Sequence, residues 1–142
     1  MLDLDEYAVR TGEASYLELA DVLRQYARDF ERDGQELFRR MVFNILIGNT
    51  DDHARNHACF WDGTALDLTP GYDICPQPRL GYSADLAMTV GHQGRAATLH
   101  NALSQAERFG LSEGEAAEYV DAMKQMVAVS YTHLTLPTIY SV

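Results

Sequence analysis

Two consecutive segments near the start of the chain carry hydrophobic residues at helical spacing. In the first, Ser15 and Glu18 form the pattern of a capping box, in which each side chain can bond a free amide of the first helical turn. The hydrophobic positions that follow are Leu19, Val22, Leu23, Tyr26 and Phe30. This spacing predicts an amphipathic helix over about residues 16–31, which Asp33-Gly34 would end.

The second segment is hydrophobic on most sides. Asp33 and Glu36 repeat the capping signal, and Gly48 stands where a helix can end in a left-handed conformation. Between them lie Leu37, Phe38, Met41, Val42, Phe43, Ile45, Leu46 and Ile47. Because a helix with so wide an apolar surface needs cover on several sides, we predict that it is the buried spine of the domain.

A β-hairpin is predicted directly downstream. Residues 57–61 and 64–68 flank Asp62-Gly63, a pair that favours the positive φ angles of a two-residue type I′ turn. Pro70 is expected to end the second strand, because proline cannot donate a backbone hydrogen bond.

The second half of the chain predicts a loop followed by helices. Residues 74–94 are rich in Pro and Gly and are expected to be mostly loop, with one apolar stretch over residues 86–90. Residues 96–109 predict a helix closed by Gly110, and Ser112 with Glu115 starts another. The predicted inward positions of that last helix are Ala116, Tyr119, Val120, Met123, Met126 and Val127. The predicted fold class is therefore mainly α with a small β-hairpin.

The end of the chain differs in composition from the rest. Residues 130–142 contain no Asp, Glu, Lys or Arg. This stretch resembles a tail that recurs on unrelated translated metagenomic reads, where sequencing-adapter DNA has been read as protein. We therefore expect one domain over residues 1–129 and a non-native tail over residues 130–142, with a different natural sequence past about Val129.

Composition limits the classes of function. The chain has 142 residues, which fits one domain, and a formal net charge of -10. That charge argues against direct binding to nucleic acid or to an anionic membrane, because both need clustered Lys and Arg. Cys59 and Cys75 are not in CxxC spacing and are interpreted as free thiols. With no signal peptide and no apolar run long enough to cross a bilayer, the expected location is the cytoplasm.

The strongest candidate for chemistry is the segment that follows the predicted buried helix. Asp51 and Asn56 have the offset of the protein-kinase catalytic loop, D-x-x-x-x-N. In phosphoryl transfer a carboxylate orients the attacking hydroxyl, and the Asn shares Mg²⁺ with a second Asp further along the chain. Here that residue would be Asp73, in Pro70-Gly71-Tyr72-Asp73. We predict that Asp51, Asn56 and Asp73 converge on one metal site.

Other interpretations of these residues remain open. Taken singly, Asp51, Asn56 and Asp73 could be turn formers, because Asp and Asn bond readily to nearby backbone. A zinc site is a further alternative, although its candidate ligands lack the tight paired spacing of zinc frameworks. Those ligands would be His53, His57, Cys59 and Cys75. The remaining histidines, His92, His100 and His133, are expected to be solvated or packed.

Three motifs together resemble one family. They are Asn49-Thr50-Asp51-Asp52-His53-Ala54-Arg55-Asn56, the downstream Pro70-Gly71-Tyr72-Asp73 and the upstream Gly12-Glu13-Ala14-Ser15-Tyr16. Over roughly residues 5–129 the chain resembles the C-terminal lobe of the HipA family, bacterial serine/threonine kinases that act as toxins of type II toxin-antitoxin systems.

The resemblance implies a kinase-like C-terminal lobe and a set of roles. It implies that Asp51 is the catalytic aspartate and that Asn56 and Asp73 are Mg²⁺ ligands. Asn49, His53 and Arg55 would support the catalytic loop, and Asp52 would occupy a variable position. The implied phosphate donor is ATP with Mg²⁺, the acceptor is a protein hydroxyl, and the implied partner is a DNA-binding antitoxin.

One part of the family pattern has no counterpart in this sequence. Nothing reads as a glycine-rich phosphate loop or as the ATP-pairing lysine of an N-terminal lobe. We therefore expect little or no kinase activity from this chain alone, because half of the nucleotide cradle is missing. Two other functions stay open: a non-catalytic helical module that binds an antitoxin, and a metal-dependent hydrolase built on Asp51, His53, His57 and Asp73.

Overall fold

The described chain is mainly helical with a small antiparallel hairpin, as predicted. The computed structural model describes residues 2–3, 15–49, 52–70 and 85–140. Its elements, in chain order, are β1 (Leu2–Asp3), α2 (Tyr16–Tyr26), α3 (Phe30–Ile47), the 3₁₀ helix η1 (Ala54–Asn56), β2 (Ala58–Trp61), β3 (Leu66–Leu68), α4 (Leu99–Leu103), the 3₁₀ helix η2 (Ala106–Phe109) and α5 (Glu113–Tyr140).

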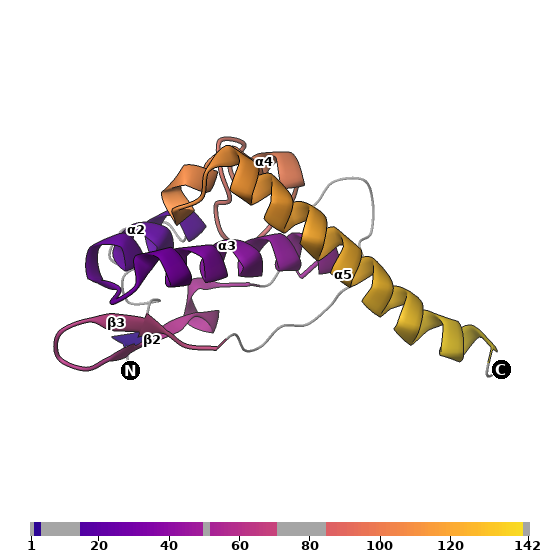
Figure 1. The fold of residues 1–142 in the computed structure, drawn as a ribbon, viewed down its shortest axis with the longest axis horizontal. Coiled ribbons are helices and arrows are strands. Elements are labelled where there is room, and N and C mark those ends of the chain that lie inside the picture. The colour runs from indigo at the N-terminus through magenta and orange to yellow at the C-terminus, as the bar shows by residue number, and fades with distance from the viewer. Residues whose placement is uncertain (1, 4–14, 50–51, 71–84, 141–142) are drawn as a thin grey trace.

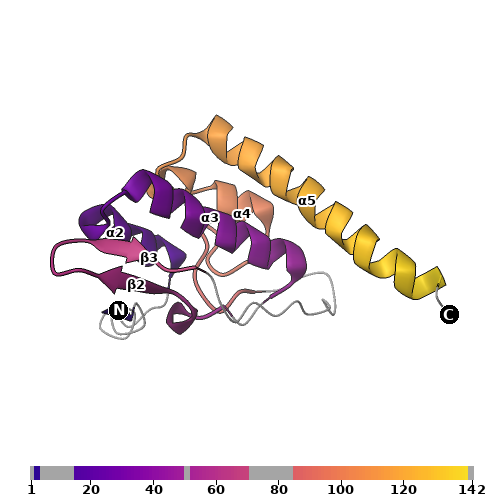
Figure 2. The same ribbon diagram turned by 60° about the horizontal axis from the view of Figure 1, so that its bottom comes forward.

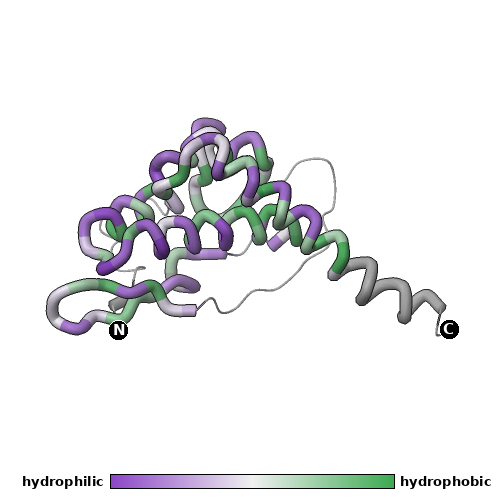
Figure 3. The backbone as a smooth tube through the Cα atoms, viewed as in Figure 1, coloured by the Kyte–Doolittle hydropathy of each residue, from purple (hydrophilic) through white to green (hydrophobic). Residues whose placement is uncertain are grey.

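Helix α3 is the central element. It packs against α2, α4, η2 and α5, and it runs through the middle of the molecule between the hairpin and the α4–α5 layer (Figures 1 and 2). Hydrophobic and hydrophilic residues alternate along α3 and along the first turns of α5 (Figure 3). The most buried side chains of α3 are Leu37, Phe38, Met41 and Val42. The predicted buried spine is therefore confirmed.

The break between α2 and α3 lies earlier than the sequence predicts. Helix α2 ends at Tyr26, and Ala27 has extended angles (φ -68°, ψ 141°). The chain leaves the helix because it pairs with β3: Ala27 forms a parallel bridge to Leu66, and the Arg28 amide donates to the Leu66 carbonyl at 2.9 Å. Asp29 then caps α3. The predicted helix over residues 16–31 was wrong at its end because this tertiary pairing is not local.

Asp33 and Gly34 lie inside α3 and do not end a helix. The buried Asp33 carboxylate accepts a hydrogen bond from the Leu68 amide at 3.0 Å, which ties the helix to the hairpin. A Cβ at Gly34 would lie 2.5 Å from the Phe109 carbonyl oxygen and 2.9 Å from Cε2 of Phe30. Glycine is therefore required here for close helix packing, and its interpretation as a helix breaker was wrong.

The hairpin turn is longer than predicted. Trp61 pairs with Leu66, so residues 62–65 form the loop instead of Asp62-Gly63 alone. The Asp62 side chain accepts hydrogen bonds from the Thr64 amide (2.8 Å) and the Ala65 amide (2.9 Å). This Asx-type capture of two backbone amides stabilises a wider turn in place of the predicted two-residue turn.

A third strand joins the hairpin. β1 pairs antiparallel with β2 through Leu2–Cys59 and Asp3–Ala58, so that β2 is central in the order β1-β2-β3. The sequence analysis did not predict β1, because two residues are too few to show a periodicity. The strand that follows η1 is thus paired on both sides.

The second half of the chain is partly as predicted. Residues 85–98 are loop with isolated bridges, and Leu86, Met88 and Val90 point into the core. The predicted helix over residues 96–109 is instead the short α4 and η2. Within α4, the Asn101 side chain donates to the loop carbonyls of Gly94 and Ala96. Gly110 closes η2 with φ 81°.

Helix α5 begins as predicted and leaves the core before its end. Ser112 and Glu115 form a reciprocal capping box, with distances of 3.2 and 3.3 Å. Ala116, Val120, Met123 and Val127 are buried, whereas Met126 is 53% exposed, so its predicted inward position was wrong. Figures 1 and 2 show the later turns of α5 extending away from the other elements. None of the described helices has the length and hydrophobicity that crossing a bilayer requires.

Candidate functional site

The candidate loop begins at a firmly held helix end. Gly48 takes the left-handed conformation (φ 74°) and its amide donates to carbonyls of the last turn of α3. The next residue, Asn49, is buried, and it bonds Asn44 twice: backbone amide to carbonyl at 2.9 Å, and Nδ2 to Oδ1 at 3.0 Å. The C-terminal role predicted for Gly48 is confirmed, and Asn49 anchors the start of the loop.

The carboxamide of Asn56 is oriented by a tight turn. Asn56 ends η1, and its Oδ1 accepts a hydrogen bond from the His53 amide at 2.8 Å, while its own amide donates to the His53 carbonyl at 2.9 Å. The His53 side chain is exposed, and the backbone of Arg55 belongs to η1. Asp51 and Asp73 lie outside the described residues, so the convergence of three ligands remains a prediction.

Directly beside this turn, a buried carboxylate faces the core. Asp52 is 3% exposed, and its Oδ2 accepts hydrogen bonds from the Tyr16 hydroxyl and from Nε2 of His57, the latter at 2.7 Å. Asn44 donates from Nδ2 to the Tyr16 hydroxyl oxygen at 3.4 Å. The second acidic residue of the Asp51-Asp52 pair is therefore held by groups from α2 and from the end of the loop.

Arg40 extends this network to the hairpin. It is 6% exposed; its Nη1 lies 3.4 Å from Nδ1 of His57, and its Nη2 donates to the carbonyl oxygen of Thr69. Its Nε donates to Oε1 of Glu36 at 3.3 Å. Because a guanidinium can only donate, Nδ1 of His57 accepts and Nε2 carries the hydrogen that is given to Asp52. We call Tyr16, Arg40, Asp52 and His57 the buried polar network.

Burial sets the chemistry of the groups around this network. Burial, and then the negative charge of Asp52, hold the pKa of the Tyr16 hydroxyl well above its ordinary value, so it remains a hydrogen-bond donor. Burial also raises the pKa of the Cys59 thiol to about 12. Within the described residues, every fully buried side-chain polar atom has a hydrogen-bond partner. The network is thus fully satisfied, as a buried polar cluster must be to persist.

The sequence analysis gave no role to most of this network. A signal was present: Glu36, Arg40 and Asn44 recur every four residues along a helix that is otherwise hydrophobic. Polar residues at that spacing share one helix face, so they indicate a buried polar contact on the predicted spine. Tyr16 and Asp52 gave no such local signal, because their contact joins residues far apart in the sequence.

The described residues contain no cluster of side chains that would support the zinc interpretation. Among them, no three His, Cys, Asp or Glu side chains gather as metal ligands would. Cys59 is buried, and both ring nitrogens of His57 are engaged, by Arg40 and Asp52. Cys75 lies outside the described residues.

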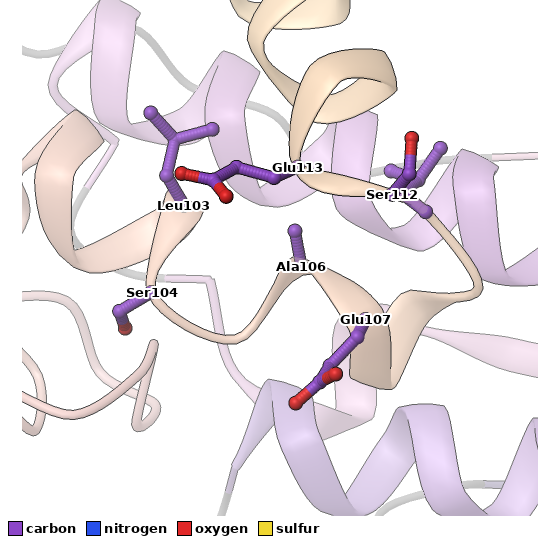
Figure 4. A pocket seen from close by; sticks show the side chains of 7 residues that line it. Leu103, Ser104, Ala106, Glu107, Ser112 and Glu113 are labelled. Atoms are coloured by element: carbon purple, nitrogen blue, oxygen red, sulfur yellow. The ribbon is translucent and has the colours of Figure 1, made fainter.

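A pocket elsewhere on the domain is separate from the loop. It has a volume of about 360 Å³ and lies where α4 and η2 meet the start of α5. Figure 4 shows the Glu113 side chain extending across it toward Leu103, while Glu107 points to the opposite side. Its lining residues are Leu103, Ser104, Ala106, Glu107, Leu111, Ser112 and Glu113. None of them comes from the candidate loop.

Comparison with known proteins agrees with the loop motif. The model of the HipA-like C-terminal domain family matches residues 1–130. A protein of Haemophilus influenzae described as "Putative kinase" is 30% identical over 80 residues. That match covers 54% of this chain and 23% of the relative, so the chain corresponds to under two thirds of the longer protein. With a family match over most of its length, the chain belongs to the HipA-like C-terminal domain family.

Proposed function

We propose that residues 1–129 are the catalytic and Mg²⁺-binding part of a HipA-type serine/threonine protein kinase that acts as a toxin. The observation that carries this proposal is that the segment containing Asp51 and Asn56 is anchored at both ends. Asn49 holds its start to Asn44 of α3, and His57 holds its end to Asp52 and Arg40. A site for phosphoryl transfer needs a loop whose ends are held, because its main work is positioning.

The proposed chemistry gives each loop residue one task. Asp51 orients the hydroxyl of a protein Ser or Thr and accepts its proton. The hydroxyl oxygen then bonds to the γ-phosphorus as the bond to the bridging oxygen of ADP breaks. Asn56 and Asp73 would hold Mg²⁺, which supplies charge neutralisation at the phosphate oxygens when bound. Asn49, His53 and Arg55 would keep the loop in shape.

The proposed ligands fit the metal by chemical type. Mg²⁺ binds oxygen ligands such as carboxylates and carboxamides, usually one or two from the protein beside the phosphates of its nucleotide. Asn56 offers a carboxamide oxygen in a turn of fixed shape. Asp73 follows soon after Thr69, whose carbonyl is held by Arg40. This donor set favours Mg²⁺ over the softer metals that prefer His and Cys.

Two further parts of the proposed function, the cationic clamp on the phosphates and the binding partner, would come from outside this chain. The phosphates would need a cationic clamp from an N-terminal nucleotide lobe, so we propose that this chain alone transfers phosphate poorly or not at all. A DNA-binding antitoxin is the proposed partner, and the net charge of -10 favours a partner with a basic contact surface. Residues 130–142 are given no part in the function; the family match ends at residue 130.

Calorimetric titration with ATP, with and without Mg²⁺, tests the metal site directly. We expect weak binding that requires Mg²⁺ and is lost in Asn56→Ala. Gln125→Ala, on the exposed face of α5, is the matched control and should bind as the unchanged chain does. Equal binding by Asn56→Ala and the unchanged chain would contradict the proposed metal site.

A γ-phosphate transfer assay tests the catalytic assignment. We expect little transfer from the purified chain to itself or to an added protein. Transfer that Asp51→Ala abolishes would support the role of Asp51 and would show that the expected inactivity of the chain alone is wrong. Tight zinc that survives dialysis would instead favour the hydrolase alternative.

A further inference from the structure

We propose that Arg40 fixes the distance between the two segments that hold the Mg²⁺ ligands, and that Asp52 fixes the direction of Arg40 through His57. Both are then positioning residues of the kinase site and not catalytic residues. This inference rests on the proposed function, and it explains how the two separate ligand segments are held at a fixed distance.

The guanidinium of Arg40 contacts both segments at once. One terminal nitrogen lies 3.4 Å from Nδ1 of His57, the residue next to Asn56. The other terminal nitrogen donates to the carbonyl of Thr69, at the end of β3, just before the segment that leads to Asp73. Because the two nitrogens belong to one planar group, the two contacts cannot move apart independently.

The backbone supports the same register. The Thr69 amide donates to the Ala58 carbonyl at 2.9 Å, so the end of β3 is paired with the start of β2. Ala58 in turn follows His57 directly. The carbonyl of Thr69 faces Arg40 while its amide faces β2, and the exit of the hairpin is held from two sides.

Asp52 and Tyr16 hold the other end of the network. Asp52 accepts from His57 and from Tyr16, so the imidazole is fixed in the tautomer that presents Nδ1 to Arg40. The negative charge of Asp52 also lies on the far side of the ring from the positive charge of Arg40. Replacement of Asp52 would leave Nε2 of His57 without its acceptor, and replacement of Arg40 would leave Nδ1 without its donor.

Stability alone is a poor reason for such a network. Burying ionic groups costs desolvation, and replacement of a whole buried network by hydrophobic residues of similar size is often equally stable. What an apolar cluster cannot do is hold two loops at a set spacing, since hydrophobic contacts are not directional. The position of Arg40 between the two proposed ligand segments is therefore the reason that we assign it a positioning role.

The network also separates the two adjacent aspartates. Asp52 is buried, and its Oδ2 receives both the tyrosine and the histidine hydrogen. It is held inside the domain and is not a ligand of the proposed ion. The roles of Asp51 and Asp52 should accordingly be distinct, although they are neighbours with the same side chain.

The test compares Arg40→Lys with Arg39→Lys, the same change one residue earlier. Arg39 is exposed on α3 and contacts Glu36 and Tyr119, not the two segments. Lysine keeps the charge but cannot make two parallel contacts. Titration of Mg²⁺ at fixed ATP should show at least about tenfold weaker Mg²⁺ affinity in Arg40→Lys, the size expected for residues that support metal ligands. Arg39→Lys should bind Mg²⁺ with the affinity of the unchanged chain.

A second readout does not depend on the nucleotide. Nitrogen-15 NMR of the His57 ring should show hydrogen on Nε2 in the unchanged chain and in Arg39→Lys. Arg40→Lys should shift the Nδ1 signal. Should Arg40→Lys fail to fold, Tyr16→Phe keeps the packing and removes only one donor to Asp52, and it should also weaken Mg²⁺ affinity.

The outcomes separate this inference from the proposed function. Mg²⁺-dependent binding lost in Asn56→Ala but unchanged in a folded Arg40→Lys, or in Tyr16→Phe where the first does not fold, overturns the positioning role alone. Binding that Asn56→Ala leaves intact, or no Mg²⁺-dependent binding at all, overturns the proposed function and this inference with it. Weaker Mg²⁺ affinity in Arg40→Lys, with the control unchanged, supports both.

Discussion

Two polar networks tie the hairpin to the helices, one inside the domain and one in water. The buried polar network joins Arg40 and Asp52 through His57. The second, which we call the exposed ion network, joins Arg28 and Arg32 to acids of the hairpin: Arg28 with Asp62 and Asp67, and Arg32 with Asp67. Its arginine side chains are 52% and 56% exposed, whereas that of Arg40 is 7% exposed.

The difference shows that burial decides what a charge contributes. In water an ion pair gains little, because both partners are already solvated and salt screens them. Inside the domain each charge and each hydrogen bond must be met by a fixed partner, so the loss of one is costly. We therefore expect the exposed ion network to rearrange more readily than the buried one. This rigidity is why we connect only the buried network to the site.

The largest expected effect is that of Arg40→Met. It removes the buried cation, leaves Nδ1 of His57 and the Thr69 carbonyl without their donor, and should lower the free energy of unfolding by about 3–5 kcal/mol. Urea denaturation followed by circular dichroism measures this change. Arg28→Met in the exposed ion network is the control and should cost far less. Equal losses in the two variants would remove the distinction between the networks.

Tyr16→Phe should have the next largest effect. The hydroxyl is buried and donates to Asp52, so its removal should lower the free energy of unfolding by about 1–3 kcal/mol. The raised pKa of Tyr16 adds a pH dependence. Its contribution is complete below pH 10, the ordinary pKa of tyrosine, and is lost as pH rises from there toward the higher pKa of the folded state. The free energy of unfolding, measured from pH 8 upward, should therefore fall less steeply with pH in Tyr16→Phe than in the unchanged chain. The same pH dependence in both would show that Tyr16 ionises normally in the folded domain.

A smaller effect is expected for Asp62→Asn in the exposed ion network. The change keeps an oxygen for the Thr64 and Ala65 amides but removes the charge that pairs with Arg28. The hydrogen bond from the Ala65 amide, then that from Arg28 and then that from the Thr64 amide, lower the pKa of Asp62. Its contribution is therefore present above pH about 4 and lost as pH falls toward the folded-state pKa.

Asp62→Ala removes both the charge and the acceptor of the two turn amides. Comparing it with Asp62→Asn therefore separates the contribution of the turn from that of the charge. Thermal melting at low and high salt should show a larger loss for Asp62→Ala than for Asp62→Asn. Salt should reduce the difference between Asp62→Asn and the unchanged chain, since an exposed pair is screened. A salt-independent difference would show that the exposed pair behaves like a buried one.

The smallest expected effect is measured at Cys59, whose thiol reports on the opening of β2. Burial, and then the negative charge of Asp33, raise the pKa of its thiol to about 12, while Arg40 acts in the opposite direction. Alkylation by iodoacetamide at pH 8 should be slow in the folded chain and fast in urea. Peptide mapping distinguishes Cys59 from Cys75. Rapid labelling of Cys59 in the folded chain would show that β2 opens readily.

Local features of the fold could be predicted from the sequence. The Ser15 cap, the buried α3, the left-handed Gly48 and the Ser112 and Glu115 capping box each depend on residues within a few positions, so the pattern contained the information. The true break at Ala27 could not be found, because it results from pairing with Leu66. Gly34 was misinterpreted for the same reason: its neighbours Phe109 and Phe30 come together only in the fold.

The family was predictable from the same kind of local signal. The family and the loop motif followed from the spacing of Asp51, Asn56 and Asp73 and from their neighbours. The support under the loop did not, because Tyr16, Arg40 and Asp52 come from three separate segments. His57 was considered only as a metal ligand, of zinc or of a hydrolase, yet its ring bridges Asp52 and Arg40. Sequence spacing identifies groups that act together on one loop, but not the groups that hold that loop from elsewhere.

Gly34 has a consequence for the loop although it lies far from it. It sits in the second turn of α3, where any side chain would meet the Phe109 carbonyl. Thirteen residues of helix separate it from Gly48, about 20 Å at the rise of an α-helix. Because an α-helix is rigid over this length, a methyl group at residue 34 would tilt α3 and displace the start of the loop at its opposite end. The tolerance of position 34 to substitution thus measures how accurately α3 must be placed for the loop to keep its position.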